Sequence, residues 1–164
     1  MSEEPAQPKD IPGVLAPPPL IFGMPLVSGL IFHESFHAFD IPQLWLPWAV
    51  RAFGGAAFVI MGAVFIALAL LRFRAAETPP EPWEETTALV TSGIYRVTRN
   101  PMYLGMALIF FGITTIAGCL ALLALLVPTV IVVDRYVIER EEAYLKRKFG
   151  APYEALLTTS RRWL

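Results

Sequence analysis

The amino-acid sequence predicts an all-α, polytopic membrane protein with about four transmembrane helices, a tight C-terminal helical hairpin and a cytosolic C-terminal helix. Three observations lead to this fold class. The chain is 55% hydrophobic, has a mean hydropathy of +0.55 and carries only 16% charged residues, whereas an ordinary soluble domain carries about 25%. Uncharged runs long enough to cross a bilayer recur along the chain. Positive charges gather between and after those runs.

The N-terminal part of the chain is rich in proline. Residues 1–17 combine charged residues with a run of prolines, so we expect a disordered lead-in. This stretch lacks the basic start of a signal peptide, which predicts that no leader is removed. Residues 18–164 are expected to form a single domain. Prolines confine its first span to residues 18–33, and Pro25 predicts a kink inside that helix.

Three further spans follow from uncharged runs. The second is predicted over residues 52–72. The run from Pro101 to Val133 is too long for one straight helix, so it predicts two spans, over residues 101–117 and 119–134. Gly118 lies between them and favours a left-handed turn. The two spans are therefore expected to form a tight hairpin.

The last helix is expected to leave the membrane without ending. Residues after Asp134 are rich in good helix formers, and Gly150 followed by Pro152 supplies a stop signal. Residues 135–164 are therefore predicted to form a cytosolic tail that starts as a helix.

The positive charges define an orientation. Only Arg51 falls on the outer side of this topology, so both termini are expected to face the cytoplasm. We expect an integral protein of the bacterial inner, or cytoplasmic, membrane. The other arginines and lysines fall on the cytoplasmic side: Lys9, Arg72, Arg74, Arg96, Arg99, Arg135, Arg140, Lys146, Arg147, Lys148, Arg161 and Arg162.

Two polar segments, residues 89–105 and 134–153, flank the predicted hairpin and return to the same membrane face. Ionisable groups at a membrane are costly enough to indicate function, so a polar site is expected there. Asn100 and Pro101 are typical of a helix start, with Asn as the N-cap and Pro in the first helical position. Such a helix start favours a carboxylate or another electron-rich group.

Glu141 and Glu142 are the acidic candidates in the second segment. Adjacent residues on a helix point about 100° apart, so only one of them is expected to face a shared site. A buried carboxylate there would suit an ammonium or sulfonium cation. The alternative interpretation is a solvated amphipathic tail at the membrane interface, and spacing alone leaves both open.

The sequence TSGIYRVTRNPMYLG, followed after a hydrophobic hairpin by EREEAYLKRKFGAPYEAL, resembles the isoprenylcysteine carboxyl methyltransferase and phospholipid methyltransferase family. The resemblance covers roughly residues 77–164, and both motifs occur in order. It implies an integral membrane methyltransferase that uses S-adenosyl-L-methionine. Matching positions imply the cofactor-binding residues: Leu89, Val90, Tyr95, Asn100, Pro101, Met102, Tyr103 and Glu141.

Two departures from the family pattern bear on the chemistry. Asn100 stands where the best-known members have His, and an amide can form hydrogen bonds but cannot titrate near neutrality. Val137 stands where prenylcysteine-modifying members place an Arg, four residues before the cofactor-binding Glu. This argues against prenylcysteine as the substrate. A phospholipid amine headgroup, a small lipophilic thiol and another hydrophobic nucleophile all stay open as methyl acceptors.

The predicted reaction is direct methyl transfer to a lipophilic or lipid-linked acceptor at the cytosolic membrane face. Catalytic candidates are Arg99, Arg135 and Arg140, which would orient an anionic substrate group, and Glu142, which would act as a base if the nucleophile is an amine. The alternative role for the arginines is interfacial anchoring. Expected partners are a lipophilic methyl acceptor from the bilayer and membrane lipids. No basic face with interleaved aromatic residues indicates a nucleic acid.

Residues 33–37 read HESFH and match the H-E-x-x-H pattern, in which two histidines one helical turn apart hold zinc beside a glutamate base. Pro42 predicts that the helix ends nearby, and the topology puts this motif across the membrane from the polar segments. We therefore predict no metal site. An intramembrane zinc metalloprotease is kept as one alternative, and a non-catalytic lipid-binding membrane protein as another.

Small residues in the second span, Gly54, Gly55 and Gly62 among them, would let another helix approach closely. That helix would belong either to the same chain or to a second copy in a homo-oligomer, and the sequence leaves both open. Cys119 is the only cysteine, which excludes an internal disulfide.

Overall fold

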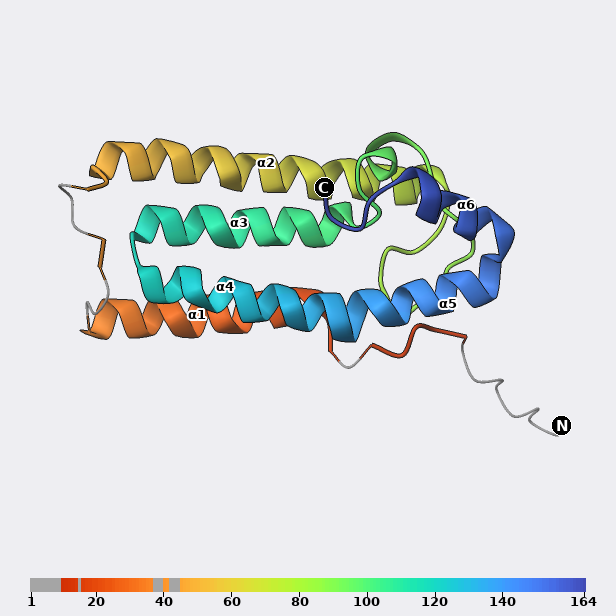
Figure 1. The fold of residues 1–164 in the computed structure, drawn as a ribbon, viewed down its shortest axis with the longest axis horizontal. Helices are drawn as coiled ribbons and strands as arrows, with labels where there is room; N and C mark the ends of the chain where they lie inside the picture. The colour runs from red at the N-terminus through yellow and green to blue at the C-terminus, as the bar shows by residue number, and fades with distance from the viewer. Residues whose placement is uncertain (1–9, 15, 37–39, 42–44) are drawn as a thin grey trace, which may run out of the picture.

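The computed structural model describes residues 10–14, 16–36, 40–41 and 45–164. Within these residues the regular elements are helices, and the only strand-like pairing consists of isolated bridges. The helices are α1 (Pro18–Phe36), α2 (Trp48–Ala75), η1 (Gly93–Arg96), α3 (Pro101–Ala117), α4 (Leu120–Val133), η2 (Asp134–Ile138), α5 (Glu139–Phe149) and α6 (Ala151–Thr159). In Figure 1, α3 lies between α2 and α4, and α1 packs beside α4.

Three helices are long and apolar enough to cross a membrane: α1, α2 and the continuous helix Leu120–Phe149. The fourth, α3, is apolar but shorter, at 17 residues. The uncharged part of Leu120–Phe149 ends at Val133, so the charged part from Asp134 onward extends beyond the hydrocarbon layer. These features confirm the predicted class of polytopic, all-helical membrane protein.

Helices α2 and α3 approach so closely that glycines are required at their contact. A Cβ atom added to Gly62 would lie 2.4 Å from the carbonyl oxygen of Gly105, and one added to Gly55 would lie 2.5 Å from that of Gly112. Real side chains do not tolerate such distances, so either addition would push the helices apart. Gly55 and Gly62 therefore allow a helix of the same chain, α3, to approach α2 closely.

The hairpin between α3 and α4 turns at Gly118, as predicted. Gly118 has a φ of +70°, and its N–H donates to the carbonyl oxygen of Thr114 at 2.9 Å. This left-handed residue ends α3 in the way that favours glycine. Arg51 is buried against the turn, and its Nη1 donates to the Ala117 carbonyl at 3.4 Å. Its positive charge therefore lies at the C-terminus of α3, where a cation is stabilising.

Helix α4 continues into α5 through η2, a π-helical turn over Asp134–Ile138. Helix α5 ends at Phe149, and Gly150 has a φ of +58°, which confirms the predicted stop. The short helix α6 then turns back along the same end of the bundle (Figure 1). The buried core contains Phe22, Tyr103, Phe110, Val133, Val137 and Ile138.

The helices differ from the predicted spans mainly at their ends. Helix α1 continues through Pro25 to Phe36 rather than ending at residue 33, and α2 runs from Trp48 to Ala75 rather than over residues 52–72. The extra residues of α2 include Trp48 and Arg74, which are side chains suited to the membrane interface. A run without charge marks the hydrocarbon part of a helix, while the helix itself extends further.

Part of the proline-rich N-terminus lies against α5. Asp10 forms an ion pair with Arg147 at 2.7 Å, and the Gly13 carbonyl accepts a hydrogen bond from Arg140 at 2.7 Å. Residues 10–14 therefore have defined contacts with α5, although the sequence predicts disorder over residues 1–17. Residues 1–9 and 15 of that stretch lie outside the described residues.

The close α2–α3 contact predicts that Gly62→Ala destabilises the protein. The added methyl group overpacks the interface, so the free energy of unfolding should fall by about 1 to 3 kcal/mol. The measurement is unfolding of the purified protein in mixed micelles with a rising fraction of a denaturing detergent.

The matched control is Gly54→Ala on the same helix, because a Cβ atom at Gly54 would meet no atom within 4 Å. Alanine is a better helix former than glycine by about 1 kcal/mol, so this variant should be unchanged or slightly more stable. Equal unfolding midpoints for the two variants would contradict the packing interpretation.

Candidate functional site

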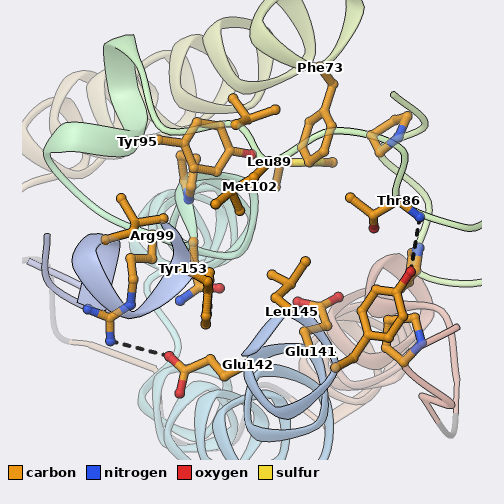
Figure 2. Close-up of a pocket in the computed structure, with 18 of the residues that line it drawn as sticks. Phe73, Thr86, Leu89, Tyr95, Arg99, Met102, Glu141, Glu142, Leu145 and Tyr153 are labelled. Atoms are coloured by element: carbon orange, nitrogen blue, oxygen red, sulfur yellow. Dashed lines mark hydrogen bonds and ion pairs between the residues drawn. The ribbon is translucent and has the colours of Figure 1, made fainter. Parts of the chain in front are cut away.

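A pocket opens at the end of the bundle where the α2–α3 connection (residues 76–100), the start of α3, α5 and α6 meet (Figure 2). All the predicted cofactor-binding residues line it, although they come from segments on either side of the α3–α4 hairpin. Of the predicted catalytic residues, Arg99 and Glu142 also line it. The residues brought together are Leu89, Val90, Tyr95, Arg99, Asn100, Pro101, Met102, Tyr103, Glu141 and Glu142.

Glu141 is a pocket-lining carboxylate that has no cationic partner among the contacts described. The Tyr103 hydroxyl donates to Glu141 Oε1 at 2.5 Å, which joins the start of α3 to α5. Burial raises the pKa of Glu141 to about 7; the hydrogen bond from Tyr103 opposes this, and the charge of Glu142 adds to it. A bound cation would favour the ionised carboxylate, so this group suits an ammonium or sulfonium ligand.

Aromatic hydroxyls surround this carboxylate. Burial raises the pKa of Tyr95, and the negative charge of Glu141 raises it further. Burial likewise raises the pKa of Tyr153, with Glu142 the next contributor. Both phenols therefore stay protonated at neutral pH, and they offer ring faces and O–H donors rather than bases.

Glu142 has a different environment from its neighbour. Arg99 Nη2 lies 3.3 Å from Glu142 Oε1, as Figure 2 shows, and Arg162 binds the same carboxylate through Nε at 3.2 Å and through Nη2 at 2.5 Å. Two guanidinium groups thus occupy the oxygens of this carboxylate, Arg99 on Oε1 and Arg162 on both. The predicted role of Glu142 as a base does not fit these contacts.

The expectation that only one of the two glutamates faces the site needs correction, because both line the pocket. Their directions do differ along the helix. Both can line the pocket because other elements surround α5 on two sides. Glu141 contacts Tyr103 of α3, whereas Glu142 contacts Arg99 and the C-terminal segment.

Arg135 and Arg140 do not line the pocket, contrary to the predicted catalytic set. Arg135 is exposed and pairs with Glu139 at 2.9 Å, and Arg140 turns to the Gly13 carbonyl. The physical reason is helical phase. Arg140 lies about 200° around the helix from Glu142, on the side of Glu141 that faces away from the pocket, and the π-helical turn at Asp134–Ile138 rotates Arg135 relative to α5.

Helix α3 begins where the sequence predicts, but the Asn100 side chain does not cap it. Asn100 occupies the N-cap position and Pro101 the first helical position, but the Asn100 side chain forms no capping hydrogen bond. Instead its Nδ2 donates to the Arg162 carbonyl at 3.0 Å. The amide is thus used to hold the C-terminal segment, and the Asn100 N–H donates to Thr98 Oγ1 at 3.2 Å.

Residues 79–90 form one wall of the pocket and are fastened to α5. The Thr86 N–H donates to the Tyr144 hydroxyl at 3.2 Å, and Lys148 Nζ bonds to the same hydroxyl at 3.1 Å. Lys148 also pairs with Glu85 at 2.6 Å. The i, i+4 spacing of Tyr144 and Lys148 is a signal that one helix face carries both groups.

Sequence reasoning missed several residues at this end of the bundle. Some lie inside the second motif without a recognisable chemical role, and the others come from segments outside both motifs. The former are Tyr144, Leu145, Tyr153 and Leu156, and the latter are Pro12, Phe73, Thr86 and Arg162. All except Arg162 line the pocket, and Tyr144 and Arg162 also hold its walls.

Residues 33–36 of the HESFH motif form the end of α1 that lies away from the pocket (Figure 1). His33 Nδ1 lies 3.1 Å from Asp40 Oδ1, while His37 lies outside the described residues. In the part of the chain that the structure describes, no group of three His, Cys, Asp or Glu side chains could hold a metal ion. The zinc alternative therefore gains no support from the described residues.

The fold and the pocket define a helical membrane protein whose polar, aromatic site suits a cationic ligand. The family model for phospholipid methyltransferase matches residues 50–152, from α2 into α6. This match covers most of the chain, and the chain belongs to that family of membrane methyltransferases. The resemblance predicted from the two motifs is thereby confirmed. No curated protein and no solved structure matches the chain.

The contact between Thr86 and Tyr144 predicts that Tyr144→Phe loosens residues 79–90. Loss of an acceptor for one backbone N–H should cost about 1 kcal/mol. Amide hydrogen exchange at residues 86–88 should then become about fivefold faster, measured by mass spectrometry in detergent.

Tyr136→Phe is the control, because Tyr136 is an exposed tyrosine about two turns earlier on the same continuous helix. Exchange at residues 86–88 should match the unmodified protein in that variant. If Tyr144→Phe also leaves the exchange rate unchanged, the hydroxyl does not hold this wall.

Proposed function

We propose that this protein is an S-adenosyl-L-methionine-dependent methyltransferase that acts on a lipophilic or lipid-linked acceptor at the cytosolic membrane face. One observation carries the proposal: the hydrogen bond between Tyr103 and Glu141 brings the two motif segments together around one pocket. Membership of the phospholipid methyltransferase family supports the same activity class.

The residues of the pocket fit the chemical groups of this cofactor. Glu141 offers a partly buried carboxylate without a cationic partner in the described contacts, which suits the cofactor's ammonium group. Leu89 and Val90 offer an apolar wall for the adenosine, and Tyr95 offers a ring that would favour a nearby sulfonium. When bound, S-adenosyl-L-methionine supplies an electrophilic methyl group on a positively charged sulfur.

The chain's own contribution to catalysis is alignment and exclusion of water. Glu141 and Tyr95 would hold the methyl donor and Arg99 would orient the acceptor, so that the acceptor's lone pair would bond to the methyl carbon as the carbon–sulfur bond breaks and a neutral thioether is released. No covalent intermediate on the protein is needed. Holding the two reactants in line is able to supply ~7 to 11 kcal/mol of the barrier. The apolar and aromatic side chains Phe73, Leu145 and Leu156 exclude water from this end of the pocket.

The acceptor is proposed to enter from the bilayer, because the pocket is built directly on the ends of the apolar helices α2 and α3. Arg99 is the predicted arginine that lines the pocket, and it would orient an anionic group of the acceptor. Val137 packs in the core, at the position where prenylcysteine-modifying relatives carry an arginine. A phospholipid amine headgroup or a lipophilic thiol therefore stays preferred over prenylcysteine.

The orientation belongs to the same proposal. Both termini would face the cytoplasm of a bacterium, since the arginines and lysines of the α2–α3 connection, α5 and the C-terminal segment lie toward the pocket end of the bundle (Figure 1). The pocket would then face the compartment that contains S-adenosyl-L-methionine.

Calorimetry on the detergent-solubilised protein tests this function. The protein should bind S-adenosyl-L-methionine and S-adenosylhomocysteine but not NADPH. Glu141→Gln keeps the shape of the side chain and removes its charge, so the affinity for both ligands should fall at least 10-fold, or about 1.4 kcal/mol.

Glu154→Gln on α6 is the matched control, because Glu154 is exposed and pairs with Lys146 away from the pocket. Its affinity should equal that of the unmodified protein. A protein that binds NADPH and neither S-adenosyl-L-methionine nor S-adenosylhomocysteine would contradict the methyltransferase function. Transfer of a labelled methyl group into an organic extract of bacterial membranes would then identify the class of acceptor.

The raised pKa of Glu141 predicts how binding depends on pH. The ionised carboxylate binds the ammonium group, and its pKa lies near 7 in the free protein. Below that value the group is increasingly protonated, so affinity for S-adenosylhomocysteine should be about tenfold weaker at pH 6 than at pH 8.

The sign of this effect follows from proton release. Binding favours the ionised form, so at pH 6 the ligand displaces a proton from Glu141, and the calorimetric heat should depend on the ionisation enthalpy of the buffer. Glu141→Gln should flatten the profile across this range. An unmodified protein whose affinity rises as the pH falls would exclude Glu141 as the ammonium partner.

A further inference from the structure

The C-terminal segment, residues 160–163, lies beside the turn that precedes α3. Thr98 and Arg161 form an isolated parallel bridge, and the Arg99 N–H donates to the Arg161 carbonyl at 2.8 Å. The Arg162 carbonyl accepts two more hydrogen bonds, from Thr98 Oγ1 and from Asn100 Nδ2, each at 3.0 Å. The main chain of this segment is thus fixed to the turn that carries the cofactor-binding residues.

The side chains of the same segment reach the opposite wall. Arg162 binds Glu142 through Nη2 and Nε, and its Nη1 lies 3.1 Å from Asp134 Oδ2. Trp163 Nε1 donates to the other oxygen of Asp134 at 2.9 Å. A guanidinium that binds a carboxylate with two nitrogens fixes both distance and direction. Arg162 therefore connects the α3 turn, through its carbonyl, with η2 and α5, through its guanidinium.

We propose that Arg162 is a positioning residue for the cofactor pocket, holding Glu142 and the Asn100 turn at a fixed separation and compensating the charge beside Glu141. The inference rests on the proposed function, since it deepens the account of the same site. Arg162 itself does not line the pocket. It acts through Glu142 and Asn100, both of which do.

The electrostatic part of this role concerns the groups that face Glu141. They are Tyr103 from α3, Tyr95 from η1, Tyr153 from α6 and the adjacent Glu142 on α5. Among these, Glu142 is the carboxylate, and its negative charge opposes ionisation of Glu141. Arg162 and Arg99 together balance that charge. Loss of Arg162 would leave one guanidinium for Glu142, and Glu141 would ionise only at higher pH.

The test is the pH dependence of S-adenosylhomocysteine binding to the full-length protein in detergent. Arg162→Gln should weaken binding about tenfold at pH 7 and shift the midpoint of the profile upward. Arg162→Lys keeps the charge but loses the two-pronged contact, so its midpoint should stay in place while its affinity falls several-fold. Arg161→Gln is the matched control, because Arg161 is the exposed neighbour in the same segment.

A second substitution separates positioning from a general loss of structure. Adding Glu142→Gln to Arg162→Gln removes the uncompensated charge, so the midpoint should return toward that of the unmodified protein. A damaged fold would not recover in this way. The inference is overturned if Arg162→Gln and Arg162→Lys both behave like Arg161→Gln.

The outcomes for the two proposals are distinct. If the unmodified protein binds neither methyl donor nor S-adenosylhomocysteine, the proposed function itself fails. If it binds and Glu141→Gln abolishes binding while both Arg162 variants bind normally, only the role of Arg162 fails. Should Arg162→Gln not yield folded protein, Arg162→Lys decides alone: unchanged affinity overturns the inference, and a several-fold loss supports it.

Discussion

The hydrogen bond from Tyr103 to Glu141 is the contact on which the rest of the site depends. It joins the first turn of α3 to α5 across the length of an apolar hairpin. The two residues are far apart in the sequence, and they meet only because Gly118 reverses the chain and α4 runs on into α5 without ending. A change in the length or the phase of either helix would separate them.

Two adjacent glutamates acquire different chemistry from their surroundings. Glu141 lies against aromatic side chains, where burial raises its pKa toward neutrality, and a cationic ligand would compensate its charge. Glu142 is already compensated by Arg99 and Arg162. The fold thus keeps one carboxylate available for a ligand and uses the other to fasten the walls of the pocket.

The membrane-spanning part of the chain supports this site by fixing α3. Glycines at the α2–α3 contact bring the two backbones together, and Arg51 donates to the Ala117 carbonyl at the far end of α3. The start of α3 is held by the C-terminal segment through Asn100. The helix that carries Tyr103 is therefore restrained at both ends, as the proposed alignment of two reactants would require.

The sequence by itself determined the helical membrane class, the turn at Gly118, the stop at Gly150 and the residues from Leu89 to Tyr103 that line the pocket, because hydropathy, turn residues and motifs are local properties of the chain. The zinc interpretation of HESFH stays a prediction that the described residues do not support, since His37 lies outside them. Only the tertiary structure decided which charged side chains meet. Helical phase and a π-helical turn removed Arg135 and Arg140 from the pocket, and the return of the tail brought Arg162 to Glu142 and Asn100. Such pairings depend on how distant segments pack, which no local pattern records.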